Sequence, residues 1–383
     1  MLAYALANAG GVLAYLPFLT LLLPLKVEAL VGPARVAVLS VILIGGAVAA
    51  SIGNILVGMV IDRSYARGGG RRGWIVLGAA ALTVSYALVL AARSPVMLFA
   101  AVVVFQLALN VMLSPIGAVM VDEVPDGQKG LAGGLLAFAQ PMAMMAAVAL
   151  VGLYEWGEGA AYLVVSLGVA LLVLPLLLAG ARPVSMTQGE AQSSMSRADL
   201  VWVGLSRLML MTANSILAGV LVYYFESLSG AVTAGTVARR VGMVSMLANA
   251  AAVPVAVSIG ALSADGRRRK LFVMIAAVLA GGALCMMLLT HSWQWAALGY
   301  GLFVCALQLY ASQHSAIVAQ ALRRPEHRAR DLGLQNLANT IPAVIGPMII
   351  LLLHASADLH VLIWAMLLLV AGCVLTLAKV RMR

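Results

Sequence analysis

The chain has 383 residues, of which 63% are hydrophobic and only 10% are charged, and its formal net charge is +10. A soluble domain carries about 25% charged residues, so this composition excludes one and indicates an integral membrane protein. The basic residues fall in short segments between apolar runs and not on one soluble face, which argues against a nucleic-acid partner.

Twelve apolar runs follow one another along the chain, each close to the length of about 20 residues that a helix needs to cross the hydrocarbon. Strands of a membrane β-barrel would alternate apolar and polar residues, and these runs do not. We therefore expect an all-α membrane protein whose partner is the lipid bilayer. The predicted transmembrane helices cover residues 2–25, 36–61, 73–92, 95–118, 130–153, 160–180, 200–224, 239–262, 271–289, 293–319, 332–353 and 360–379.

The longest polar segment between runs, 181–199, is rich in Ser, Gln and Met and follows the sixth run. We expect an N-terminal six-helix bundle over 1–180, a cytoplasmic linker over 181–199 and a C-terminal six-helix bundle over 200–383. The first run has no basic leader, so we interpret it as a retained helix and not as a signal peptide. The three cysteines lie inside apolar runs and give no disulfide or zinc pattern.

The basic residues predict how the chain is oriented. Eighteen of the 24 Lys and Arg residues fall on one side, five fall on the other, and Arg207 lies within a span. Under the positive-inside rule, both termini are then cytoplasmic. We expect a multi-pass monomer in a bacterial inner membrane.

Two pairs of loops repeat along the chain. "GMVIDRSYARGGGRR" follows the second run and "GALSADGRRRK" follows the eighth, which places Asp62 and Asp265 203 residues apart. The segments after the fourth and tenth runs also match, with Gly133 and Gly333 at an offset of 200. Two loops repeating at nearly one offset indicate duplicated six-helix halves, an organisation typical of many secondary transporters.

The first repeated loop resembles the loop 2–3 signature of the major facilitator superfamily, with a longer spacer over 64–69. "RRGWIVLGA", "DLGLQNLANTIP" and "LVYYF" resemble the glycoside–pentoside–hexuronide carriers and the sucrose-transporter-like branch. The residues that carry the superfamily resemblance are Gly58, Asp62, Arg63, Gly70, Arg71 and Arg72.

The resemblance implies two six-helix bundles around a central cavity that opens alternately to either side, lined by helices 1, 4, 7 and 10. Melibiose-type carriers of this branch bind sodium through acidic residues within helices. The second and fourth predicted helices carry no mid-span Asp or Glu, so we do not expect a sodium site of that kind.

Acidic residues beside the repeated basic loops have two interpretations. They pair with neighbouring arginines at the membrane interface, or they form a latch with the amide groups at the start of helix 5 or 11, which typically contributes about 0.3–1 kcal/mol. A latch would favour the outward-open state, and it would be asymmetric, because Leu322 and Arg323 replace Asp122 and Glu123 in the second half. The candidate gating residues are Asp62, Arg63, Arg71, Arg72, Asp122, Glu123, Asp265 and Arg267.

Polar residues at helical spacing lie within the predicted helices 4 and 10. Unpaired polar groups in hydrocarbon cost several kcal/mol, so these stripes either bond between helices or line the cavity that the resemblance implies. Amide and hydroxyl groups suit a neutral hydroxylated ligand such as a sugar. The stripes are Gln106, Asn110 and Ser114, and Gln308, Ser312 and Ser315.

Arg207 lies about 9 Å along the helix from Val201. It either extends to the interface or, with Asn214 on the same face, serves a polar ligand. His314 is either a neutral hydrogen-bonded core residue or a proton site, and Glu226 is a second candidate for proton coupling. The candidate substrate-binding residues are Tyr15, Gln106, Asn110, Ser114, Arg207, Asn214, Gln308, Ser312, Tyr310 and His314.

The sequence therefore favours a secondary transporter that moves a small polar solute, such as a sugar or glycoside, with proton coupling as one option. The alternatives are an exporter of amphiphilic compounds, a lipid scramblase or a non-transporting membrane sensor. The sequence contains no HExxH motif, no GxSxG motif and no clustered Cys/His pattern. We therefore expect no enzyme, cofactor or metal site.

Overall fold

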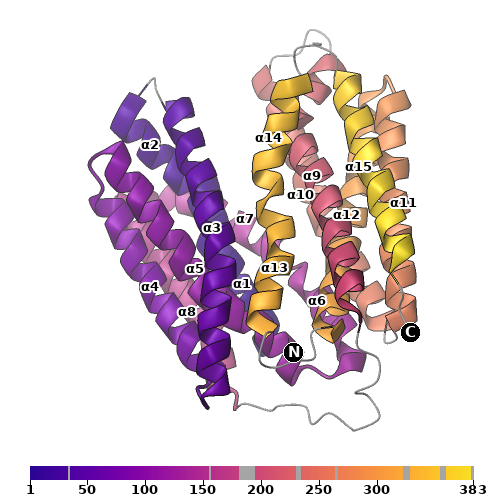
Figure 1. The fold of residues 1–383 in the computed structure, drawn as a ribbon. Helices are drawn as coiled ribbons and strands as arrows, with labels where there is room; N and C mark the ends of the chain where they lie inside the picture. The colour runs from indigo at the N-terminus through magenta and orange to yellow at the C-terminus, as the bar shows by residue number, and fades with distance from the viewer. Residues whose placement is uncertain are drawn as a thin grey trace. The chain divides into compact units, whose positions relative to one another are not determined.

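The computed structural model describes residues 1–32, 35–154, 157–180, 195–229, 234–263, 266–321, 328–353 and 359–380. Within those ranges all regular structure is helical (Figure 1). Twelve helical segments of the described residues are long and apolar enough to span a membrane. The predicted all-α class and the twelve predicted spans are therefore confirmed.

In the first half of the sequence, the first span consists of two α-helical segments joined by a π-helical turn that follows Pro17. The bounds of the helices in this half are α1 (Leu2–Pro17), η1 (Phe18–Leu22), α2 (Leu23–Val31), α3 (Arg35–Ala66), α4 (Arg71–Ala91), α5 (Pro95–Glu123), η3 (Asp126–Gln128), α6 (Lys129–Leu136), α7 (Ala139–Tyr154) and α8 (Glu158–Leu178).

The second half has five long helices and one span that is divided at Ile341. The bounds are α9 (Arg197–Ser227), α10 (Ala234–Leu262), α11 (Gly266–Leu289), α12 (Trp293–Ala321), α13 (Arg328–Thr340), α14 (Pro342–Leu353) and α15 (Leu359–Lys379).

Local sequence explains several helix ends. Ser94 precedes α5 and its Oγ accepts a hydrogen bond from the Met97 amide, while Pro95 takes the first helical position, where its missing N–H costs nothing. Ser196 caps α9 in the same way through the Asp199 amide. Gly32 ends α2 with a positive φ of 53°, which a residue with a side chain rarely adopts.

The described chain forms two compact units that differ from a simple division into sequence halves. Unit 1 contains α1 to α5, α7, α8 and α13, and unit 2 contains η3, α6, α9 to α12, α14 and α15. The short helix α6 is thus packed with the second-half helices α10 and α12, and α13 is packed with α3 and α5. The predicted linker over 181–199 lies outside the described residues up to 194, and the division at that segment stays a prediction.

Glycines allow α6 and α13 to approach their neighbours closely. A Cβ added to Gly133 would lie 2.5 Å from the Ser312 carbonyl oxygen in unit 2, and one on Gly333 would overlap the Asn54 carbonyl in unit 1. These two glycines are the pair that repeats at an offset of 200. Their repetition therefore has a packing reason in both units, since only glycine lets the backbones meet at this separation.

An aromatic cluster fills the core of unit 1 between α4, α5, α8 and η1. Phe18, Tyr86, Phe105 and Tyr162 lie with ring centroids 4.3–6.4 Å apart in tilted and edge arrangements. The Tyr86 hydroxyl donates to the Ala14 carbonyl of α1, which satisfies its polar end. The cluster holds α1 against α4 and α5 and so fixes the frame on which the charged residues of unit 1 are placed.

Candidate functional site

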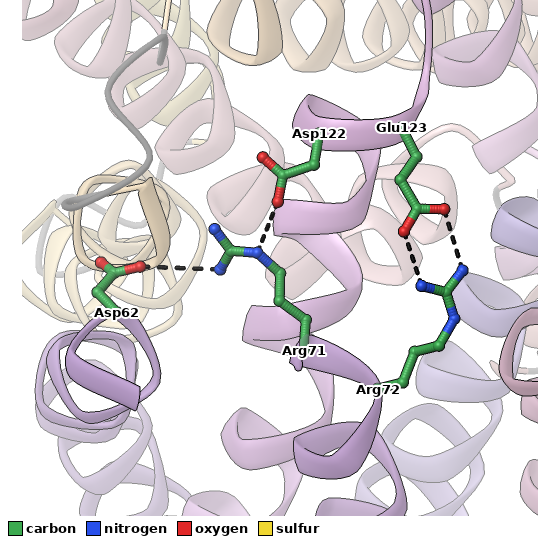
Figure 2. Close-up of polar contacts among 5 residues, drawn as sticks. All are labelled: Asp62, Arg71, Arg72, Asp122 and Glu123. Carbon is green, nitrogen blue, oxygen red and sulfur yellow. Dashed lines mark hydrogen bonds and ion pairs between the residues drawn. The ribbon is translucent and has the colours of Figure 1, made fainter. Parts of the chain in front are cut away.

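A buried guanidinium joins the ends of three helices in unit 1 (Figure 2). Arg71, the first residue of α4, donates from Nε to Asp122 Oδ2 of α5 at 2.6 Å, and its Nη1 lies 3.7 Å from Asp62 Oδ1 of α3. The exposed fractions of these side chains are 4% for Arg71, 4% for Asp62 and 8% for Asp122. The Tyr65 ring covers Arg71 with its centroid 4.3 Å from Cζ. We call Asp62, Arg71 and Asp122 the charged triad.

A second pair stands next to the triad. Arg72 donates from Nη1 and Nη2 to the two carboxylate oxygens of Glu123 at 2.9 and 3.0 Å, which is the planar fork that guanidinium and carboxylate form best. Its Nε donates to the Leu176 carbonyl in the last turn of α8 at 3.1 Å. A cation at the carboxyl end of a helix satisfies a carbonyl that has no intrahelical partner. Arg72 therefore ties α4, α5 and α8 together.

Helix α3 continues past the predicted end at residue 61 to Ala66. Asp62 consequently lies within a helix and not in a loop, with its side chain turned inward, while its neighbour Arg63 is exposed. The ion pairs join the predicted gating residues of α3, α4 and α5 other than Arg63. Asp265 and the side chain of Arg267 lie outside the described residues, and the gating role of the whole set stays a prediction.

Unit 2 contains a polar cluster within two of its candidate membrane spans. Arg207 of α9 lies 2.9 Å from His314 of α12, measured from Nη1 to Nδ1, and His314 Nε2 lies 3.1 Å from the Val203 carbonyl of α9. The rings of Tyr310 and His314 are stacked with centroids 5.7 Å apart. The Tyr310 hydroxyl lies 2.7 Å from Ser206 Oγ. We call Ser206, Arg207, Tyr310 and His314 the polar cluster.

The contacts fix the protonation of the imidazole. A guanidinium only donates hydrogen bonds, so His314 Nδ1 accepts from Arg207. A carbonyl oxygen only accepts, so Nε2 carries a hydrogen and donates to Val203. His314 is therefore neutral and protonated on Nε2 in this state. This agrees with the hydrogen-bonded core histidine that the sequence left as one alternative.

The contacts also determine which hydroxyl group of the cluster donates and which accepts. Ser206 Oγ donates to the Val203 carbonyl at 2.7 Å and therefore accepts from Tyr310. Cys373 of α15 lies beside the Tyr310 hydroxyl. Tyr310 is fully buried, so these contacts hold its ring in place against His314. The imidazole is thereby positioned from one side by Tyr310 and from the other by Arg207.

The polar stripe of α5 is turned towards α3 within unit 1. The amide Nδ2 of Asn110 donates to the Gln106 carbonyl at 2.8 Å and to the Ala50 carbonyl at 3.3 Å. Gln106 and Ser114 are also buried. These contacts are those of the interhelical alternative.

The remaining candidates are placed as follows. Ser312 is buried, and its Oγ has no hydrogen-bond partner among the described residues. Tyr15, Asn214, Gln308 and Glu226 are half-buried. Among the described residues, no group of three or more His, Cys, Asp or Glu side chains is arranged to hold a metal ion.

Sequence reasoning missed two buried lysines, which it counted only as charges that orient the chain. Lys26 donates to the Leu90 carbonyl at 2.9 Å and pairs with Glu158 at 3.0 Å in unit 1. Lys129, the first residue of α6, donates to the Ala319 carbonyl at the end of α12 in unit 2. Each lysine lies next to the carboxyl end of another helix, where a cation is favourable. A cation near such an end was the only feature by which the sequence could have marked these two residues.

The amide contacts between α3 and α13 were also missed in part. Asn336 donates to Asn54 Oδ1 at 3.0 Å, and Ser51 lies 2.9 Å from the Thr340 hydroxyl. The sequence offered no partner for these side chains of α13. Asn54 is isolated in the second apolar run and carries no pattern that marks it.

A comparison with protein families identifies the chain. The model of the Major Facilitator Superfamily matches residues 2–347, most of its length. The chain belongs to the Major Facilitator Superfamily. As a member of that superfamily it is a secondary transporter and not an enzyme. No curated protein sequence matches it significantly.

Solved structures of the superfamily share its fold. The human organic anion transporter MFSD10 (TETRAN) is similar with a TM-score of 0.75, 15% sequence identity and 98% of each chain covered. A bacterial homologue of the iron transporter ferroportin, in an outward-facing state, has a TM-score of 0.72, 16% identity and coverage of 99% of this chain and 97% of its own. The E. coli fucose:proton symporter FucP has a TM-score of 0.69, 14% identity and coverage of 98% and 97%. At these identities the likeness concerns the fold alone.

Proposed function

We propose that this superfamily member transports a small polar solute by alternating access and that a proton accompanies the solute. The observation that carries the proposal is the polar cluster in unit 2, which places a cation, an imidazole and two hydroxyl groups within two candidate membrane spans. Ionisable side chains within membrane helices are costly to maintain and usually serve a substrate or ion pathway. Hydroxyl and amide groups in the same helices suit a solute that carries hydroxyl groups itself, such as a sugar or glycoside.

Uptake into proteoliposomes tests the proposal. The purified protein is reconstituted, an inward-directed pH gradient is imposed, and a panel of labelled sugars, glycosides and sugar acids is offered. We expect at least one solute to accumulate, with accumulation lost when the gradient is dissipated and reduced in His314→Gln. Arg240→Gln serves as control, because Arg240 is an exposed cation near the start of α10. If no solute accumulates while labelled lipid exchanges between leaflets, the protein is a scramblase and the proposal fails.

Two further lines support a hydroxylated solute. The segments "RRGWIVLGA" and "DLGLQNLANTIP" resemble the glycoside–pentoside–hexuronide branch, which moves sugars, and one protein of the same fold is named a fucose:proton symporter. Export of an amphiphilic compound is the alternative. Counterflow separates the two, since a sugar carrier exchanges labelled for unlabelled sugar, whereas an exporter of amphiphiles responds only to apolar cations or dyes.

We infer that the charged triad belongs to the cytoplasmic gate. Its carboxylates lie at the ends of α3 and α5, next to the basic segment that the positive-inside rule places in the cytoplasm. Asp62→Asn would remove one of the two negative charges around Arg71 and shift the balance between inward-open and outward-open states. Cysteine accessibility from each side measures that balance. An unchanged balance in Asp62→Asn, with Arg67→Gln as the exposed control next to α3, would remove the triad from the gate.

A further inference from the structure

One hydrogen bond joins the positive charge of the polar cluster to its titratable group. Arg207 Nη1 donates to His314 Nδ1 at 2.9 Å. The guanidinium stays protonated at any physiological pH, whereas the imidazole exchanges a proton near neutrality. Anything that binds Arg207 in place of His314 therefore exposes the Nδ1 lone pair, and anything that protonates Nδ1 breaks this hydrogen bond.

We propose that Arg207 binds a carboxylate or phosphate group of the transported solute and that His314 takes up a proton at Nδ1 as that group binds. This proposal rests on the proposed function and names its substrate class, a small hydroxylated anion. It also assigns the coupling step to the exchange of one hydrogen-bond partner for another. Sugar acids and hydroxy acids belong to this class, whereas neutral sugars do not.

The chemistry favours the exchange. A carboxylate or phosphate accepts two parallel hydrogen bonds from a guanidinium and forms charge-assisted bonds roughly twice as strong as neutral ones. The imidazole nitrogen is a single neutral acceptor, so an anion displaces it. The freed Nδ1 then accepts a proton from water, which forms one N–H bond and leaves hydroxide to the bulk solution.

Charge balance links the two events. A monovalent anion bound to Arg207 offsets its positive charge, and it therefore lowers the cost of a second positive charge on His314, which is otherwise high within a membrane helix. Each event therefore makes the other more favourable, and thermodynamic reciprocity requires the two effects to be equal. Couplings of this kind typically change affinity by about 5–150-fold.

The surroundings of the pair leave His314 as the group that titrates. Among the described ionisable groups, Arg207 and Tyr310 contact His314, and Cys373 lies beside Tyr310. Of these four side chains, only the imidazole of His314 belongs to a residue type with an ordinary pKa near 7. The other ionisable side chains described on the helices packed around α12 lie in the first two or last two turns of those helices. They are Lys129, Asp199, Tyr223, Tyr224, Glu226, Arg239, Arg240, Arg268, Arg269, Lys270, Cys285, His360 and Lys379.

Binding measurements on the purified full-length protein test the substrate class. Thermal unfolding is followed with glucuronate, galacturonate, lactate, gluconate and inorganic phosphate, each against a neutral counterpart such as glucose or galactose. A ligand that binds the folded state raises the unfolding temperature. We expect at least one anion to do so in the wild type, less in Arg207→Lys, not at all in Arg207→Gln, and as in the wild type in Arg240→Gln. The proposal is overturned if no anion binds in an Arg207-dependent way.

The proton linkage has its own measurement. If one proton is taken up with the anion, the dissociation constant falls by up to about tenfold for each unit by which pH is lowered. We expect this slope in the wild type and a flat profile in His314→Asn. An equal slope in both would refute His314 as the proton acceptor.

The wild type also reports the step directly, which guards against a variant that fails to fold. The nitrogen-15 spectrum of the His314 ring should show the neutral form protonated on Nε2 without ligand and a doubly protonated ring after anion is added. A ring that stays neutral with the anion bound would refute the coupling.

The outcomes separate this inference from the proposed function. Uptake of a neutral sugar at an unchanged rate in Arg207→Gln would overturn the anion site and leave transport intact. Arg207-dependent binding of an anion without uptake in proteoliposomes would support the site and overturn transport.

Discussion

Removing the Arg71 guanidinium should destabilise the protein far more than removing that of its neighbour Arg72. Arg71 is nearly fully buried and lies between two buried carboxylates. Truncating one partner of a buried ion pair costs about 3–5 kcal/mol, because the remaining charge is left in a medium that solvates it poorly. Arg72 and Glu123 are 21% and 17% exposed. Their hydrogen bonds are partly replaced by water, so Arg72→Met should cost about 1–2 kcal/mol.

The cost of Arg71→Met should be recovered by neutralising its partners. Arg71 Nη1 and Nη2 lack hydrogen-bond partners among the described residues, so the wild-type triad itself carries unsatisfied donors. Replacing a whole buried ionic set by neutral groups is often close to neutral in stability. We therefore expect the variant Arg71→Met with Asp62→Asn and Asp122→Asn to regain at least half of the loss.

Reversible unfolding in mixed micelles measures these free energies, with the single, double and triple variants arranged as a cycle that isolates the coupling. Arg72→Met is the control for loss of a neighbouring cation. The reasoning is refuted if the two arginine variants lose equal stability. It is also refuted if neutralising Asp62 and Asp122 adds to the loss caused by Arg71→Met.

Two further predictions follow from the packing. Gly133→Ala should lower the free energy of unfolding by about 1–3 kcal/mol, because the added methyl group meets the Ser312 carbonyl. Gly242→Ala, where a Cβ would meet open space, should raise it by about 0.5–1 kcal/mol. Changes of the same sign in the two variants would contradict this. Lys26→Met should cost about 1.5–3 kcal/mol because it leaves the Glu158 carboxylate without its cation. Adding Glu158→Gln should restore part of the stability in the same assay, and a further loss would show that the pair is not the cause.

The class of fold could be predicted from the sequence because it follows from a one-dimensional property. Each apolar run is long enough to span a bilayer, and a bilayer leaves helices as the only open structure that satisfies its own backbone. Helix ends were less certain, since α3 continues through Asp62 to Ala66. A charged residue can extend a helix when it has a partner, and Asp62 has Arg71. That partner belongs to another helix, so a local sequence pattern does not identify it.

The candidate site could also be predicted only in part. Helical spacing placed Gln106, Asn110 and Ser114 on one face, but spacing alone does not tell which helix that face meets. The structure supplies the answer for Asn110, whose amide bonds to the Ala50 carbonyl of α3. The pairing of Arg207 with His314 was likewise beyond the sequence, because 107 residues separate them.

In both units a cation from one helix donates to a carbonyl at the carboxyl end of another helix. The second residue of α4, Arg72, donates to the Leu176 carbonyl at the end of α8, and Lys270 near the start of α11 donates to the Val380 carbonyl just after α15. The sequence repeat therefore extends to the capping of a helix by a cation from another helix.

The preceding residues of each pair, Arg71 and Arg269, are both buried. Arg71 is bound by carboxylates, whereas Arg269 donates from Nε to the Ser263 carbonyl. A carboxylate can be neutralised by a proton and a carbonyl cannot. Protonation of the charged triad would therefore weaken the anchoring of Arg71 in unit 1 and leave this contact of Arg269 in unit 2 unchanged.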